Sequence, residues 1–188
     1  MKRMARGLAV LSCCLLLPLS ACGKQKPDPA QIAARYENSS FSAQYTVTTH
    51  AGFYSEYELD CRYEKGTSHV MVLRPESVAG ICGILDRETA VLQYEDVALD
   101  ALLPETAGYA PMDVLHVVVS QLCDPQGAVY GAEQERVTVE YRTLLQDGKE
   151  SLKLITLHPE TLDLVAAECY LDGSLILTLH MDALSWDG

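Results

Sequence analysis

The chain has 188 residues, and its 26 Asp and Glu against 14 Lys and Arg give a formal net charge of −12 at pH 7. This length suits one domain with one core. The acidity argues against nucleic acid as a partner, because phosphate contacts need clustered Lys and Arg. The acidity serves solubility, or it offers a surface complementary to a basic partner.

The chain begins with the pattern of an export signal. Three basic residues lie within the first six positions, and an apolar run covers residues 8–19. This run is too short for a stable membrane span, and small residues follow it, as before a cleavage site. The pattern predicts a signal peptide over residues 1–21.

The four residues Leu19-Ser20-Ala21-Cys22 end this segment. They resemble the bacterial lipoprotein box, and the resemblance implies that Cys22 is diacylated on sulfur and becomes the N-terminus after cleavage. Removal of residues 1–21 leaves a net charge of −15. An anionic leaflet repels such a chain, so we expect the lipid to hold it at the outer side of the cell membrane.

Residues 22–27 form a short polar tether, and residues 28–188 are expected to form a single domain. Asp28 is a suitable N-cap, and Pro29 fits the first position of a helix. Beyond this helix, period-2 alternation and turn residues predict strands. Nine strands are expected, at residues 41–49, 56–63, 68–73, 78–85, 90–94, 137–145, 151–157, 165–171 and 174–184.

The middle of the chain has a different pattern. Residues 97–103 and 112–122 are predicted as helices, although the run of three valines at 117–119 also suits a strand. The loop at 104–111 between them carries Tyr109, which either anchors a partner or belongs to a plain connector.

These elements predict a mainly β (α+β) fold. About nine antiparallel strands form a curved sheet, an unclosed half-barrel, and two or three helices cover its concave face.

A family resemblance enters in the last third of the chain. Residues 154–161 end a strand in the turn His158-Pro159-Glu160-Thr161, and an Asp-Gly hairpin at 172–173 leads to the closing strand. This pattern resembles the close of the outer-membrane lipoprotein carrier (LolA-like) superfamily, although His158 replaces the usual acidic residue. Residues 73–76, Leu-Arg-Pro-Glu, resemble an early strand end of the same family.

The chain also looks like the lipid-anchored Gram-positive members of that superfamily, including the spore germination type. The resemblance implies an unclosed β-barrel with a helical lid over a hydrophobic concave face. Relatives use that face for acyl chains, or use the scaffold to hold another protein. Because a chain fixed in one membrane cannot shuttle between two, the carrier role itself is disfavoured.

The concave face is the candidate ligand site. Alternation alone does not separate an open pocket from a filled core. The side chains expected to line the face are Tyr45, Tyr57, Leu59, Val70, Val72, Leu115 and Val119.

We find no catalytic motif, and we expect no metal or cofactor. The five histidines lack metal-ligand spacing, and Ser174 belongs to a hairpin turn. His180 and Asp182 share a strand face, which is either a solvated polar face or a proton-transfer site. An envelope hydrolase is therefore the weakest interpretation.

Four cysteines follow the predicted lipidation site: Cys61, Cys82, Cys123 and Cys169. Outside the cytoplasm they can form two disulfides in three connectivities, or they can stay reduced as small buried apolar residues. Cys61 lies on the apolar side of its strand and is expected to be buried.

The sequence thus predicts a membrane-anchored, extracytoplasmic, non-enzymatic binding protein. We favour a protein partner, such as an envelope or spore-cortex factor that the chain scaffolds or regulates. The alternative is a lipid or acyl chain bound on the concave apolar face.

Overall fold

The computed structural model describes residues 28–37, 39–52, 54–103, 107–132 and 135–187. The predicted signal peptide, Cys22 and the tether lie outside these residues. The described part contains eleven strands and two helices. They are α1 (Pro29–Tyr36), β1 (Ser40–Thr49), β2 (Ser55–Glu64), β3 (Thr67–Arg74), β4 (Cys82–Leu85), β5 (Thr89–Tyr94), β6 (Val97–Leu102), α2 (Val114–Cys123), β7 (Ala128–Ala132), β8 (Val137–Leu144), β9 (Glu150–Leu157), β10 (Leu164–Leu171) and β11 (Ser174–Trp186).

All strands belong to one antiparallel sheet in the order β6-β5-β4-β3-β2-β1-β11-β10-β9-β8-β7. Two meanders, β1 to β6 and β7 to β11, meet where the first strand pairs with the last. The end strands β6 and β7 are not paired with each other, so the sheet is curved but unclosed. This confirms the predicted mainly β half-barrel.

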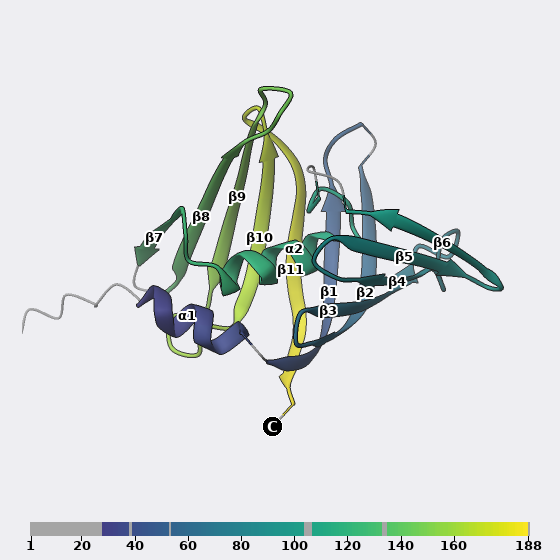
Figure 1. The fold of residues 1–188 in the computed structure, drawn as a ribbon, viewed down its shortest axis with the longest axis horizontal. Helices are drawn as coiled ribbons and strands as arrows, with labels where there is room; N and C mark the ends of the chain where they lie inside the picture. The colour runs from purple at the N-terminus through teal and green to yellow at the C-terminus, as the bar shows by residue number, and fades with distance from the viewer. Residues whose placement is uncertain (1–27, 38, 53, 104–106, 133–134, 188) are drawn as a thin grey trace, which may run out of the picture.

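Helix α2 carries the chain from one end of the sheet to the other and crosses the concave side (Figure 1). Val114, Leu115, Val118, Val119 and Leu122 are all 0–1% exposed. Packing on the sheet therefore stabilises this helix despite its β-branched run.

One buried polar pair ties α2 to the sheet. His116 Nδ1 lies 2.9 Å from Ser68 Oγ of β3, and burial lowers the pKa of His116. A neutral imidazole with a hydroxyl partner can be buried at little cost, since neither group remains unpaired.

Two segments that were not predicted as strands each form one. Residues 97–103 were predicted to be helical, but residues 97–102 form β6, which pairs with β5 from Tyr94 and Val97 at the turn to Thr89 and Leu102 at the base. Residues 128–132, which lie outside the nine expected strands, form β7 against β8. The predicted strand at 78–85 is also shorter, since only its second half pairs, as β4.

Helix α1 begins as predicted, with Asp28 Oδ1 accepting a hydrogen bond from Ala30 N at 3.0 Å and Pro29 in the first turn. Its buried residues are Ile32, Ala33 and Tyr36. The Tyr36 hydroxyl donates to the Leu162 carbonyl at 2.9 Å. The helix that follows the tether is therefore fixed to the sheet.

Asp163 collects the polar contacts that hold α1 to the last strand. It accepts hydrogen bonds from Arg35 Nε at 3.0 Å and from Trp186 Nε1 at 2.8 Å. The Arg35 guanidinium carbon also lies 4.3 Å from the Trp186 ring centroid. Burial works to raise the pKa of Asp163, but hydrogen bonds from Arg35, Thr161 and Trp186 outweigh it, and the pKa is lowered.

We expect Asp163→Asn to lower the free energy of unfolding at pH 7 by about 1–2 kcal/mol, because charge-assisted hydrogen bonds are lost. A carboxyl whose pKa is lower in the folded state stabilises the protein above its unfolded pKa, 3.8. That contribution disappears as the pH falls through the folded pKa. Urea unfolding at pH 7 and pH 3 should therefore show a difference between wild type and variant at pH 7 that shrinks at pH 3. Asp96→Asn, in the exposed β5–β6 turn, is the control and should change neither value.

Candidate binding site

An apolar hollow of about 350 Å³ opens beside the N-terminal end of α2. We call it the hairpin pocket, because the β5–β6 hairpin forms one of its walls. Among the described residues of its lining, Asp113 is the one with a charged side chain. The apolar lining includes Tyr57, Val72, Ile81, Leu92, Ala101 and Met112.

The approach of the chain to α2 shapes this pocket. Asp113 is 9% exposed, and its Oδ1 accepts a hydrogen bond from Ala110 N at 3.0 Å. Burial raises the pKa of Asp113. Met112 lies so close to Gly83 of β4 that an added Cβ would be 2.9 Å from the methionine Cε. The lack of a side chain at Gly83 therefore makes room for one wall of the pocket.

Beyond the pocket, apolar side chains continue along the hairpin. Leu92 pairs with Leu99, and Tyr94 pairs with Val97, so all four lie on one face, the face that carries buried Ala90. Their exposed fractions are 36%, 62%, 49% and 60%, respectively. We call Leu92, Tyr94, Val97 and Leu99 the hairpin patch. Contiguous exposed apolar surface of this kind marks interaction sites in soluble domains.

The structure places the predicted ligand residues in two groups. Tyr57 and Val72 line the hairpin pocket. The other five belong to α2 or to strands of the buried core, and they are at most 2% exposed. These five are Tyr45, Leu59, Val70, Leu115 and Val119. The central concave face is thus occupied by α2, and the open apolar surface lies to one side, on the hairpin.

Sequence analysis missed the hairpin patch because it assigned residues 97–103 to a helix. Assigning both segments as strands of one hairpin would have found it, because Leu92 and Tyr94 of β5 pair with Leu99 and Val97 of β6. Two such runs joined by a two-residue turn place their apolar side chains on one face.

A buried polar cluster lies on the other side of the segment that enters α2. The Tyr109 hydroxyl donates to the Tyr170 carbonyl at 2.8 Å and lies 2.6 Å from Ser151 Oγ. Lys153 is 5% exposed, and its Nζ lies 4.6 Å from the Tyr109 ring centroid. Burial lowers the pKa of Lys153. Tyr109 therefore fastens the loop to the sheet, and its ring and hydroxyl are engaged within the chain.

One more polar group is buried near the helix. The Tyr45 hydroxyl has no hydrogen-bond partner among the described residues, and burial raises its pKa well above 10.0. This hydroxyl stays protonated at physiological pH.

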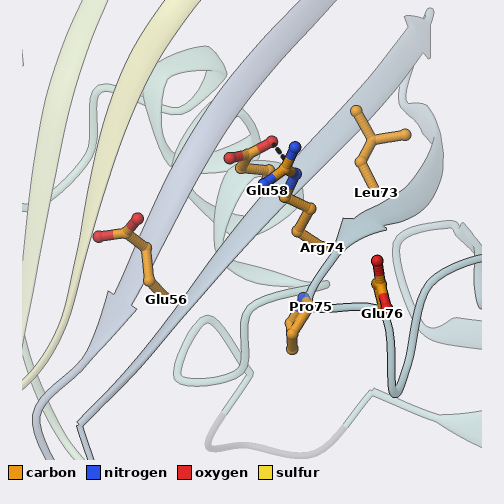
Figure 2. Close-up of a pocket in the computed structure, with 6 residues that line it drawn as sticks. All are labelled: Glu56, Glu58, Leu73, Arg74, Pro75 and Glu76. Atoms are coloured by element: carbon orange, nitrogen blue, oxygen red, sulfur yellow. Dashed lines mark ion pairs between the residues drawn. The ribbon is translucent and has the colours of Figure 1, made fainter.

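A second hollow, at the end of β3, has the opposite character (Figure 2). Its lining contains Glu56, Glu58, Glu76 and Arg74, and Figure 2 shows Arg74 facing Glu58, with 3.3 Å between Arg74 Nε and Glu58 Oε2. The Arg74 side chain is 71% exposed. An open, charged hollow of this kind does not suit an apolar ligand.

Two further findings concern the described residues only. They include no group of three or more His, Cys, Asp and Glu placed to hold a metal ion. They also include no helix with the length and apolar character needed to cross a membrane.

The four cysteines after the predicted lipidation site are free thiols. Cys61 and Cys169 are each 0% exposed, and burial raises the pKa of each to about 12. The predicted burial of Cys61 is confirmed.

We expect Cys61 and Cys169 to resist alkylation in the folded protein at pH 8, because both access and thiolate formation are suppressed. Cys82 and Cys123 are both half-buried, and burial raises the pKa of the Cys123 thiol, so Cys82 should react first. Iodoacetamide labelling followed by peptide mass spectrometry measures this, and Cys82→Ser should remove the early signal. Denaturant without reductant should expose all four thiols to labelling. Rapid modification of Cys61 in the native state, or protection of any pair after denaturation, contradicts the expectation.

No protein-family model matches the sequence, and no curated protein matches it. Solved structures do match, and they include proteins of the predicted superfamily. A LolA superfamily protein from Nitrosomonas europaea is 11% identical, with 85% of this chain and 92% of that chain covered and a TM-score of 0.46. A chain in the structure of the CwlD amidase from Clostridioides difficile in complex with the GerS lipoprotein is 13% identical, with 85% and 96% covered and a TM-score of 0.45.

An uncharacterized conserved protein from Thermus thermophilus is 9% identical, with 85% of this chain and 86% of that chain covered and a TM-score of 0.52. At such identities the likeness shows the fold alone, and the function has to be argued from this chain's own surface.

Proposed function

We propose that this chain is a membrane-anchored, extracytoplasmic, non-enzymatic binding protein that engages a protein partner through the hairpin patch and the hairpin pocket. One observation carries the proposal. Four neighbouring apolar side chains, 36–62% exposed, extend directly from an apolar hollow. Burying such surface against a partner is favourable by about 25 cal/mol per Å² of apolar area.

The anchor and the location form part of the same proposal. A signal peptide at 1–21, lipidation of Cys22 and a tether at 22–27 would keep the domain of residues 28–188 beside the membrane. The partner is then an envelope or spore-cortex protein that meets the chain there. The net charge of −15 that follows removal of residues 1–21 favours a basic partner surface.

Site-specific photo-crosslinking tests the partner. A benzophenone amino acid at Leu92 should form an adduct with one defined protein in cells of the native host. Val165 of β10 is the matched control, since it is 37% exposed and Leu92 is 36% exposed. Adding Leu99→Asp to the Leu92 probe should abolish the adduct. Equal protein adducts at both positions, or none at Leu92, would count against the proposal.

A second candidate function is binding of a lipid or acyl chain in the hairpin pocket. The apolar lining of that pocket favours it, because ligand pockets for apolar molecules are mostly hydrophobic with few polar groups. We expect native mass spectrometry of the wild-type protein to show no stoichiometric lipid beyond the N-terminal anchor. A co-purifying fatty acyl ligand that is lost in Ala101→Trp, which fills the pocket, would instead favour the lipid function.

A further inference from the structure

Strand β6 is an edge strand that lacks Lys, Pro and a bulge, and its one charged side chain is Asp100. It pairs with β5 on one side, and no described residue pairs with its other side. All six residues of β6, Val97–Leu102, are exposed. Edge strands are normally blunted by Lys, Pro, bulges or short length, because their free N–H and C=O groups invite another strand. β6 has six residues, contains no Lys or Pro, and pairs regularly with β5.

The other edge of the sheet is different. Strand β7 has five residues, Ala128–Ala132, and four of them are half-buried. It contains Gly131, which weakens a strand interior. The edge that invites pairing is therefore the one that adjoins the hairpin patch.

The two faces of β6 specify the side chains of an added strand. Val97, Leu99 and Ala101 lie on the face of the hairpin patch, and Ala98, Asp100 and Leu102 lie on the opposite face. A strand beside β6 would place alternate side chains next to Val97 and Leu99, where apolar groups are favoured. Its other side chains would lie next to Asp100, where cations are favoured, since cross-strand neighbours of opposite charge attract.

The surroundings of the edge are acidic. Residues 86–103 contain five acidic side chains and one basic one, Arg87. Asp86, Glu88, Glu95, Asp96 and Asp100 are all exposed. A second copy of this chain is a poor partner for β6. Antiparallel pairing of two β6 strands would bring two Asp100 carboxylates together, and the two strongly negative domains would repel each other.

We propose that β6 accepts an added β-strand from a protein partner, and that this strand alternates apolar and basic side chains. The inference rests on the proposed function and adds the binding mode and the chemistry of the partner segment. Backbone hydrogen bonds supply affinity, and the alternate side chains supply specificity.

Labelled synthetic peptides test the binding mode by fluorescence anisotropy with the full-length mature protein. The probe is a ten-residue peptide that alternates valine and lysine. It should bind at least about tenfold more tightly than a valine–glutamate peptide and than a valine–lysine peptide of the same composition in block order. N-methylation of every second amide should weaken binding by about tenfold or more, because strand pairing needs those N–H groups.

Two variants test whether the peptide binds at strand β6. Asp100→Lys should weaken binding about fivefold or more, whereas Glu76→Lys, the same charge change on an exposed loop, should leave it unchanged. Circular dichroism verifies that both variants are folded. Equal binding of the N-methylated peptide, or equal effects of the two variants, overturns the proposal. A dimer that sedimentation velocity detects in the wild type, and that Leu99→Asp abolishes, also overturns it in favour of a second copy.

The two proposals fail in distinguishable ways. If the Leu92 probe crosslinks a defined protein but the alternating valine–lysine peptide binds no more tightly than its control peptides, the binding function stands and strand addition is wrong. If the Leu92 probe yields no protein adduct and a lipid co-purifies, the proposed function itself is wrong.

Discussion

Leu115→Asp is expected to unfold the protein at room temperature, whereas Leu99→Asp is expected to leave it folded. Leu115 is 1% exposed on the face of α2 that packs on the sheet, and Leu99 is 62% exposed in the hairpin patch. An unpaired charge in an apolar interior costs several kcal/mol. This cost is comparable with the total stability of a small domain, about 5–15 kcal/mol.

Val119→Asp should behave like Leu115→Asp, because Val119 is 0% exposed. Leu115→Met preserves volume and apolar character, so its cost should stay below about 1.5 kcal/mol. Thermal and urea unfolding followed by circular dichroism measure all four variants. A folded Leu115→Asp with a melting temperature near that of the wild type would mean that α2 covers a wet cleft. The concave face beneath it would then regain its place as the ligand site.

Much of the fold could be predicted because local signals and tertiary packing agree. The strand β2 alternates Leu59, Cys61 and Tyr63 with charged side chains, and the structure buries all three. The turn at Asp172-Gly173 joins β10 to β11, and both residues have positive φ angles, 48° and 73°. Asp-Gly is favoured there because few other residues adopt this conformation readily.

The segment at 97–102 could not be assigned from local signals. Its sequence, Val-Ala-Leu-Asp-Ala-Leu, contains four Ala and Leu residues, which favour helices. Pairing with β5 overrides that preference, and the turn at Glu95-Asp96 brings the two strands together, with Glu95 at a φ of 51°. One misassigned element thus concealed both the edge strand and the hairpin patch.

The candidate site depended on a second kind of information. Alternation shows which side chains share a face of a strand, but it does not show where a helix lies on that face. Val70 and Leu92 both belong to the same face of the sheet through the pairing of β3, β4 and β5. Val70 belongs to the packed interior around α2 and is 2% exposed. Leu92 lies at the margin of that interior and is 36% exposed. Only the tertiary structure separates the core from the candidate binding surface here.

Cys22→Ala is expected to abolish attachment of the protein to the membrane. The prediction rests on Leu19-Ser20-Ala21-Cys22 and on the basic start of the chain. Two acyl chains hold a protein firmly at a bilayer, whereas one chain binds only marginally. Without the thiol no acyl chain can be added at this position, and cleavage before residue 22 should also fail.

Metabolic labelling with an alkyne fatty acid, followed by fractionation and mass spectrometry, measures both effects. The wild type should be labelled and sediment with membranes, and Cys22→Ala should be unlabelled and uncut at this position. Cys14→Ala is the matched control, because it removes a cysteine from the same segment and should change neither result. An unmodified thiol on Cys22 in the native protein would overturn the anchor. With the anchor in place, the six residues 22–27 reach at most about 20 Å. The start of α1 would then lie close to the membrane surface, and the β5–β6 hairpin lies at the other end of the molecule (Figure 1).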